Sequence, residues 1–356
     1  MASGLDDVVA AETLLSDVDG AGGRLTIRGH ALAELSGRWS VEAVVTLLLD
    51  GFFELPEPEA LRAELAGARA DVYARIAAHL PHLAALGAYD GMRAGIALLP
   101  DGETFEDALR LIAAPAVLLP ALLRIERSEQ PIPPRARLGH AADMHWMLTG
   151  SEAPASARAL ETYLVTICDH GLNASTFAAR VVASTGAGLM SAALAGLGAL
   201  KGPLHGGAPG PVIEMLDAIG ESGNAHAWLA DRVERGERLM GFGHRIYRVR
   251  DPRADALKAA VRRLGSGGRL AFAEAVERAA LDVLRTHKPH RPLETNVEFF
   301  TALLLEAVGF PPHAFTGVFA AGRMAGWLAH AREQALTGRL LRPRSHYVGP
   351  VPGLAA

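Results

Sequence analysis

Apolar residues recur with helical spacing along most of this chain of 356 residues, and that periodicity limits its fold more than any other feature. Ser40 precedes VEAVVTLLLDGFF and Thr104 precedes FEDALRLIAAPAVLLPALLRIER, and both residue types commonly cap helix N-termini. Only GRLTIRG, at residues 23–29, has the composition of a short strand. The sequence therefore predicts an all-α protein with a small N-terminal β element.

Charge and length exclude some classes of protein. The 35 Lys and Arg residues nearly balance the 39 Asp and Glu residues, so the chain lacks the basic surface that binds nucleic acid. Half of the residues are hydrophobic, and the length predicts about two domains. The single cysteine, Cys168, excludes an intramolecular disulfide and fits a reducing compartment.

Two stretches of the sequence indicate where in the cell the protein is located. The N-terminus, MASGLDDVVAAETLLSDVDG, carries acidic residues instead of a basic n-region, so we expect a retained, cytoplasmic protein. The segment 181–200 has no charge and is long enough to raise the question of a membrane span. Ala, Gly, Ser and Thr dominate it, which favours a single buried helix over a span.

Two histidines lie in segments rich in turn and capping residues. In DHGLNASTFAARVVAST, His170 precedes a helix that Asn173 or Ser175 can cap, and it can serve either as a core residue or as a ligand group. In GPLHGGAPGPV, His205 follows Pro203 and precedes two glycines, and Pro209 and Pro211 begin a new helix. The positive end of that helix would keep the imidazole neutral and suited to donate a hydrogen bond to a developing enolate. The alternative is a tight turn in which the histidine only packs.

The segment GFGHRIYRVRDPRADALKAAVRRLG predicts a helix with an arginine in its first turn. Asp251 is the expected N-cap, Pro252 the first helical residue, and Gly265 the end of the helix. A cation at Arg253 opposes the helix dipole, which indicates either a bound anion there or a solvated side chain.

An arginine and a glutamate interrupt apolar runs near the C-terminus. Phe315, Phe319 and Arg323 share one helix face, which Trp327 continues. A buried guanidinium requires an anion, either a protein carboxylate or a substrate carboxylate. Glu298, within NVEFF, is either a surface residue or a desolvated base.

Other catalytic patterns are missing from the sequence. Gly241-x-Gly243 lacks both the preceding strand and the third glycine of a dinucleotide fingerprint. There is no G-x-S-x-G nucleophile elbow, which disfavours a Ser-His-Asp hydrolase. The histidines near the motifs lack ligand spacing such as H-x-x-x-H, which disfavours a metal enzyme.

Taken together, four segments resemble the citrate synthase family. In this order, HGLNASTFAARVVAST resembles its HELNAST-type segment, GPLHGGA its HGG loop, GFGHRIYRVRDPRA its GHR…DPRA segment and NVEFF its NVDF motif. The resemblance extends over most of the chain. It implies a helical homodimer in which residues 209–307 form a small domain between the two parts of a large domain, residues 1–208 and 308–356.

The resemblance also implies an activity and a set of site residues. The family condenses acetyl-CoA with oxaloacetate and hydrolyses the citryl thioester, with coenzyme A thioester as substrate and no further cofactor or metal. By motif, Glu298 would remove the α-proton, His205 would bind the enolate oxygen, and His244 would polarise the ketone and protonate it. Oxaloacetate would be bound by His170, Arg253, Arg323 and, from the other subunit, Arg342. Coenzyme A would be approached by Gly241, Phe242, Gly243 and Arg248.

Three departures from the family pattern leave the substrate open. Glu298 stands where the family has aspartate, Gly171 follows His170 in place of glutamate, and Pro209-Gly210 replaces the Asn-Glu of HGGANE. Two alternatives therefore accompany citrate formation. One is a 2-methylcitrate synthase that uses propionyl-CoA, and the other is a regulator that binds CoA or a dicarboxylate without efficient turnover.

Overall fold

The computed structural model describes residues 8–206, 209–265, 267–291 and 293–349. Near its N-terminus lies a three-stranded antiparallel sheet in the order β1 (Ser16–Asp19), β2 (Arg24–Ile27) and β3 (His30–Ala31). The register pairs Asp17 with Thr26 and Thr26 with Ala31. The sequence predicts only the middle strand. The outer two are missing from that prediction because they are short and polar and show no alternating apolar pattern.

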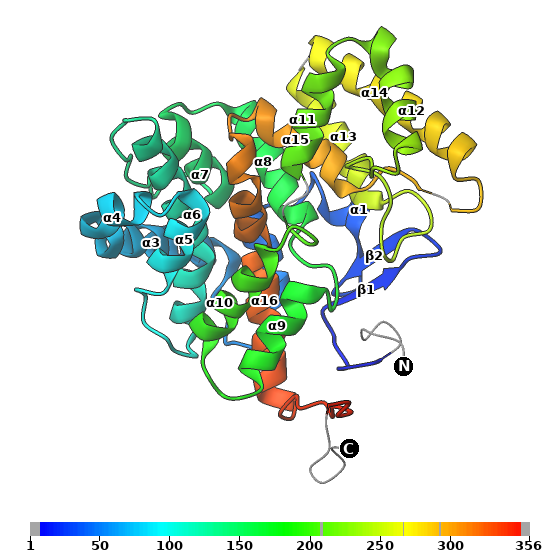
Figure 1. Cartoon of the computed structure of the whole chain (residues 1–356). Coiled ribbons are helices and arrows are strands. Elements are labelled where there is room, and N and C mark those ends of the chain that lie inside the picture. Colours follow the sequence, from blue (N-terminus) through cyan, green and yellow to red (C-terminus); the bar gives the residue numbers. More distant parts are fainter. Residues whose placement is uncertain (1–7, 207–208, 266, 292, 350–356) are drawn as a thin grey trace.

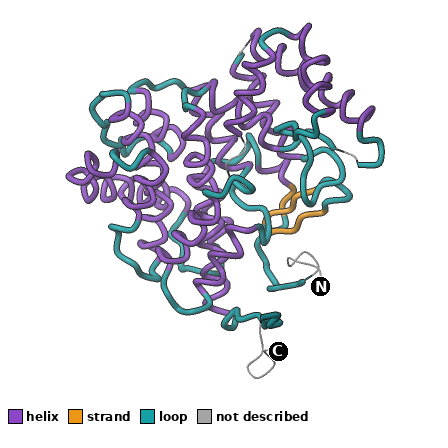
Figure 2. The backbone as a smooth tube through the Cα atoms, viewed as in Figure 1, coloured by secondary structure: helices purple, strands orange, loops and turns teal. Residues whose placement is uncertain are grey.

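Helices make up the rest of the fold, as predicted (Figures 1 and 2). The first group is α1 (Leu32–Leu35), α2 (Val41–Leu49), α3 (Pro58–Ile76), α4 (Leu80–Ala84), α5 (Ala88–Ile96), α6 (Phe105–Glu126) and α7 (His140–Thr149). Next come α8 (Pro154–Thr166), α9 (Ala174–Ala183), α10 (Leu189–Leu200), α11 (Pro209–Ile219) and α12 (Ala225–Glu234). The last are α13 (Pro252–Leu264), α14 (Gly267–His287), α15 (Val297–Ala307) and α16 (Phe315–Thr337), and three 3₁₀ turns are η1 (Ala77–His79), η2 (Ser222–Asn224) and η3 (Pro312–Ala314).

The predicted caps start helices where the sequence places them. The Ser40 side chain accepts a hydrogen bond from the Ala43 amide at the start of α2. At the start of α6, Thr104 and Asp107 each accept from the other's backbone amide, which is a capping box. These bonds satisfy amides that have no partner inside the helix, so the short-range sequence signal is sufficient to position both helix starts.

The single buried helix predicted over residues 181–200 is wrong. The structure ends α9 at Ala183 and begins α10 at Leu189. Between them Gly186 and Gly188 have φ angles of +78° and +85°, a conformation that glycine adopts readily and that interrupts a right-handed helix. The apolar composition of this stretch therefore belongs to two shorter helices that pack against each other.

Helix α16 lies at the centre of the molecule and contacts α2, α5, α6, α8, α9 and α10 (Figure 1). Within the described residues, α6 is the one helix long and apolar enough to cross a membrane. Because 83% of its most apolar window is buried inside the protein, α6 is a core helix. The core thus consists of two long helices surrounded by shorter ones.

Helices α11 to α15 form a second group, in which α11 and α13 pack on α15 and α12 packs on α14 (Figure 1). Both α13 and α15 also contact α8, which in turn contacts α16. Side chains at the N-termini of α13 and α15 therefore face the same region as side chains of α9 and α16. The division at residues 208 and 307 remains a prediction.

Candidate active site

The start of α9 positions the His170 loop. The Asn173 side-chain oxygen accepts hydrogen bonds from the Ser175 and Thr176 amides, both at 3.1 Å, so Asn173 rather than Ser175 is the N-cap. Gly171 has a φ of +58°, and this left-handed conformation favours glycine where the family pattern has glutamate.

A tight turn after α10 carries His205. The Gly206 amide donates to the Leu200 carbonyl at 3.1 Å and lies 3.2 Å from the Gly202 carbonyl oxygen. A Cβ atom at position 206 would collide with that Leu200 oxygen, so the turn requires glycine. The Thr316 hydroxyl donates to the Gly206 carbonyl at 2.9 Å and holds the turn against α16. The following residues, Gly207 and Ala208 of the HGGA motif, lie outside the described residues.

His205 contacts a buried polar group. Its Nε2 atom forms a 2.8 Å hydrogen bond with Ser175 Oγ, which also accepts from Trp327 Nε1 at 3.2 Å. Burial, with the positive charge of Arg323 as the second cause, lowers the pKa of His205 to about 4. The ring is therefore neutral at pH 7, as predicted. The largest cause of its lowered pKa is burial, whereas the sequence analysis attributes neutrality to the helix N-terminus.

Backbone amides orient His244. The Ile246 and Tyr247 amides donate to Nδ1 at 3.0 and 3.1 Å. Burial, with Arg253 as the second cause, lowers the pKa of His244 to about 4, so the ring is neutral at pH 7. A neutral imidazole whose Nδ1 accepts must carry its proton on Nε2. His244 consequently presents an uncharged Nε2–H donor.

His170, His244 and Tyr247 form a compact group. The ring centroids of His170 and His244 are 5.5 Å apart, and Tyr247 lies 5.6 Å from the first and 4.8 Å from the second. His170 Nε2 forms a 3.2 Å hydrogen bond with the Tyr247 hydroxyl. Burial and then the charges of Arg253 and Arg323 hold the pKa of His170 well below its usual range. This histidine is neutral and lies next to two cationic groups.

The first turn of α13 pairs Arg253 with Asp251. As predicted, Asp251 is the N-cap, Pro252 begins the helix and Gly265 ends it in the left-handed conformation. Arg253 Nε donates to Asp251 Oδ1 at 3.0 Å, and its Nη2 donates to Oδ2 at 2.8 Å. The anion beside Arg253 is thus the Asp251 carboxylate, which accepts hydrogen bonds from Nε and Nη2 of the guanidinium.

Arg323 has no such carboxylate. Its side chain is buried in α16, its Nε donates to the Ile167 carbonyl at 2.6 Å, and the guanidinium stacks over Phe319 at 5.0 Å. Its Nη2 atom is buried with no hydrogen-bond partner among the described residues. Burial lowers the pKa of Arg323 to about 10, and the charge of Asp169 is the largest effect that opposes the fall. An unpartnered buried donor on a cation that also lacks a paired carboxylate is a candidate anion-binding group.

Glu298 lies in the first turn of α15. The Asn296 side chain accepts from the Glu298 amide at 3.0 Å and caps the helix. Burial raises the pKa of Glu298 to about 7, although Arg253 opposes the rise. A carboxyl group that titrates near neutrality is well matched to general-base work at physiological pH.

The two predicted glycines of the CoA loop have a structural role of their own. Gly241 and Gly243 have φ angles of +85° and +82°, and Phe242 between them packs on Phe299 at 5.3 Å. The Gly243 amide donates to the Glu294 carbonyl at 2.7 Å, which ties this loop to the segment before α15. Contact of this loop with CoA remains a prediction.

The structure brings most of the predicted residues to one region but leaves two outside it. Mutual electrostatic effects link His170, His205, His244, Glu298, Arg253 and Arg323. Arg248 and Arg342 are exposed, the first on the loop before α13 and the second on the tail after α16. Binding of oxaloacetate by Arg342 from the other subunit would require a dimer, and this role remains a prediction.

Sequence reasoning missed several polar groups of this region. It names Ser175 and Asp251 only as possible caps, and it does not name Tyr247 or Tyr163. Tyr163 is fully buried on α8, burial raises the pKa of its hydroxyl, and the charges of Arg323, Arg253 and Glu298 also act on it. Tyr247 lies three residues after His244, so its closeness in sequence is a usable signal. Tyr163 lies in an ordinary helical pattern and offers no such signal.

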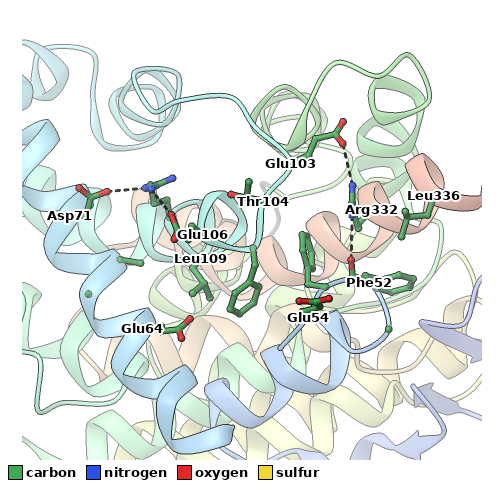
Figure 3. Close-up of a pocket in the computed structure, with 16 residues that line it drawn as sticks. Phe52, Glu54, Glu64, Asp71, Glu103, Thr104, Glu106, Leu109, Arg332 and Leu336 are labelled. Carbon is green, nitrogen blue, oxygen red and sulfur yellow. Dashed lines mark hydrogen bonds and ion pairs between the residues drawn. The ribbon is translucent and has the colours of Figure 1, made fainter. Parts of the chain in front are cut away.

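A cavity of about 1260 Å³ lies away from these residues, between α3, the start of α6 and the end of α16 (Figure 3). Its two arginines are paired, Arg110 with Asp71 at 3.0 Å and Arg332 with Glu103 at 3.2 Å. None of the predicted site residues lines it. The chemistry expected from the sequence is therefore not in this cavity.

Comparisons with known proteins agree with the geometry. The family described as "Citrate synthase, C-terminal domain" matches residues 4–344. A putative citrate synthase 2 of Mycobacterium tuberculosis is 40% identical over 98% of this chain and 93% of its own length. A 2-methylcitrate synthase of the same species is 36% identical over 97% of this chain and 90% of its own length.

A solved structure shows the same fold. It is the citrate synthase of Thermoplasma acidophilum in a ternary complex with carboxymethyl coenzyme A and oxaloacetate. That structure is 28% identical, with a TM-score of 0.87, and the match covers 98% of this chain and 96% of that one. The similarity spans the helices, the N-terminal sheet and all four motif segments. The chain therefore belongs to the citrate synthase family of condensing acyltransferases.

Proposed function

We propose that this enzyme condenses acetyl-CoA with oxaloacetate and water to form citrate and CoA. The observation that carries the proposal is the buried guanidinium of Arg323, whose Nη2 has no partner among the described residues. A cation in this state requires an anion, and the neighbouring His170 and His205 are neutral. A carboxylate of oxaloacetate supplies that anion.

The first step is removal of an α-proton from acetyl-CoA. The Glu298 carboxylate takes the proton, the electron pair of the broken C–H bond forms the C=C bond of the enolate, and the carbonyl π pair moves onto the thioester oxygen. His205 donates a hydrogen bond to that oxygen as its charge develops. The Ser175 hydroxyl has two acceptors within reach, Asn173 Oδ1 at 2.7 Å and His205 Nε2 at 2.8 Å. In the reactive state its proton turns from Asn173 to His205 Nε2, which leaves the imidazole proton on Nδ1 for the enolate.

The second step forms the carbon–carbon bond. The enolate carbon attacks the ketone carbon of oxaloacetate, and the ketone oxygen takes the proton of His244 Nε2. The ring regains a proton through solvent as the protonated Glu298 releases one, so both groups return to their starting states. Arg253 and Arg323 hold the substrate carboxylates, His170 lies between them, and Arg342 of a second subunit completes the clamp. Water then hydrolyses the citryl thioester and releases CoA, which binds at Gly241, Phe242, Gly243 and Arg248.

A homodimer with two domains in each subunit, in the cytoplasm, is part of the same proposal. Beyond α16 the described chain forms neither helix nor strand, and Leu340, Tyr347 and Val348 are 59%, 70% and 87% exposed. Apolar side chains on such a segment are commonly covered by a partner. The exposed apolar side chains therefore support a contact between the segment after α16, which includes Arg342, and the neighbouring subunit. Cys168 is a buried free thiol, which suits a reducing compartment.

Propionyl-CoA is the second candidate acyl donor. The relative named 2-methylcitrate synthase is 36% identical, and Glu298 is longer than the aspartate of the family motif. One methylene in a pocket discriminates between substrates by only about 1–3 kcal/mol, so a small change in the site is sufficient to change the preferred donor.

The test is a matrix of acetyl-, propionyl- and butyryl-CoA against oxaloacetate, pyruvate, glyoxylate and 2-oxoglutarate, with release of free CoA thiol as the readout. We expect the highest kcat/KM for acetyl-CoA with oxaloacetate. A higher value for propionyl-CoA would replace citrate by 2-methylcitrate. Tight CoA binding without thiol release from any pair would contradict catalysis and favour a regulator.

A further inference from the structure

The N-terminal hairpin, defined here as residues 14–27 with strands β1 and β2, contacts two loops of the candidate active site. One is the loop that carries His170, and the other is the segment 244–250, which carries His244 and Tyr247. In Figure 1 the hairpin lies beside the loop that precedes α13.

The beginning of the hairpin is anchored to the large helical core. The Ser16 hydroxyl donates to Asp169 Oδ2 and accepts from the Gly171 amide at 2.8 Å. The Leu14 amide donates to Glu333 Oε1 on α16 at 2.8 Å. Because Asp169 and Gly171 flank His170, these bonds fix the hairpin relative to that histidine.

The turn of the hairpin contacts the segment 244–250. The Arg248 amide donates to the Gly20 carbonyl at 2.8 Å. A Cβ atom at position 20 would collide with the Ile246 carbonyl oxygen, so only glycine fits. The turn itself is rigid, since Asp19 Oδ1 accepts from the Ala21 and Gly22 amides at 3.1 and 2.7 Å.

Ile246, which lies against Gly20, also orients the His244 ring. The Ile246 amide donates to His244 Nδ1 at 3.0 Å, while its carbonyl lies against Gly20. That carbonyl belongs to the same peptide unit as the Tyr247 amide, which donates to His244 Nδ1 at 3.1 Å, so a shift of the unit reaches the imidazole directly. Glu298 and His205 lie on other elements, α15 and the turn after α10, and have no described hydrogen bond to the hairpin.

We propose that the hairpin is a positioning element that sets His244 and Tyr247 relative to His170, with Gly20 and Ser16 as its positioning residues. Its effect on catalysis rests on the proposed function. A larger residue at position 20 displaces the Ile246 peptide and weakens the hold on His244 Nδ1, and misplacement of a catalytic group by about 1 Å can cost about a hundredfold in rate.

The test compares Gly20→Ala with the matched control Gly67→Ala. A Cβ at position 67, on α3, meets no atom within 4 Å. Hydrogen exchange measured by mass spectrometry requires no activity, and we expect amides of residues 244–250 to exchange at least tenfold faster in Gly20→Ala and unchanged in Gly67→Ala. Unchanged exchange in Gly20→Ala would overturn the proposal.

A second readout separates positioning from general damage. In Gly20→Ala we expect kcat/KM for condensation to fall at least tenfold, whereas α-proton exchange of the acyl-CoA in deuterated water stays within twofold. Equal loss of both reactions would contradict a selective effect on His244. If the wild-type enzyme catalyses neither reaction, the proposed function fails, and amide exchange still decides the role of the hairpin.

Ser16→Ala keeps the proposal testable if Gly20→Ala does not fold. This variant removes the bonds to Asp169 and Gly171 without adding bulk. We expect faster amide exchange both at residues 169–173 and at residues 244–250, because the hairpin joins the two loops. Faster exchange at 169–173 alone would show that the loops are independent and would overturn the proposal.

Discussion

His244 Nε2 lies 3.3 Å from Nη2 of Arg253, and both atoms are hydrogen-bond donors. His244 carries its proton on Nε2 because two backbone amides donate to its Nδ1. Arg253 Nη2 also donates to the Asp251 carboxylate. Two donors that face each other favour an acceptor oxygen between them. In the proposed reaction that acceptor is the oxaloacetate ketone or its neighbouring carboxylate.

His205 and His244 act at opposite ends of the new bond, so their removal should have different effects. His205→Ala should lose both α-proton exchange and condensation by roughly 100- to 1000-fold, as for loss of an oxyanion donor. His244→Ala should lower condensation by a similar factor and spare exchange, measured in deuterated water. Equal loss of both reactions in both folded variants would contradict this division.

Glu298 should be essential, and its length should matter. Glu298→Gln cannot accept a proton and should nearly abolish turnover. Glu298→Asp withdraws the carboxylate by about one C–C bond, ~1.5 Å, and should slow acetyl-CoA turnover. Steady-state thiol release measures both. A severalfold gain in acetyl-CoA turnover in Glu298→Asp would show that the site prefers another acyl group, and unchanged turnover in Glu298→Gln would exclude Glu298 as the base.

The pH dependence of α-proton exchange should report Glu298. Burial raises the pKa of this carboxyl to about 7, and only its deprotonated form is a base, so the rate should rise with pH through about 7 and level off above it. The pKa values of His205 and His244, about 4 each, leave both rings neutral over that range. A rate constant with no pH dependence between pH 5 and 8 would rule out this assignment.

Arg323 should contribute to oxaloacetate binding at the expense of stability. Arg323→Met removes a charged hydrogen bond to substrate, which is worth about 1.5–3 kcal/mol, and should raise KM for oxaloacetate roughly 10- to 150-fold. Because the same change removes a buried charge without a carboxylate partner, Tm should not fall. Arg332→Met, on the same helix but paired with Glu103, is the control and should leave KM unchanged. A lower Tm with unchanged KM would indicate a purely structural arginine.

The buried pair of Arg69 and Asp143 should dominate local stability near α7. Both side chains are fully buried, and Arg69 Nε donates to Asp143 Oδ2 at 2.5 Å. Asp143→Ala leaves a buried cation unpaired and should lower the free energy of unfolding by about 3–5 kcal/mol in urea denaturation. Asp231→Ala, which breaks an exposed pair with Arg235, should cost less than about 1 kcal/mol. Similar losses in both variants would show that burial is not the deciding factor.

Local sequence determined the starts of the site helices. Asn173 and Asp251 accept hydrogen bonds from amides two or three residues away, so the residues that make each cap are adjacent in the chain. Pro252 and Gly265 delimit α13 for equally local reasons. The four motifs likewise predicted the family, and the roles of their residues remain predictions.

Tertiary structure alone decided which charges have partners. Arg253 and Arg323 look alike in sequence, yet the first is held by the Asp251 carboxylate and the second only by the Ile167 carbonyl, 156 residues away. The outer strands of the sheet also depended on pairing with the middle strand, which no window of sequence displays. Helix caps and apolar periodicity arise from interactions within about one helical turn. Burial, shifted pKa values and the contact of Gly20 with Ile246 arise from residues that only the folded chain brings together.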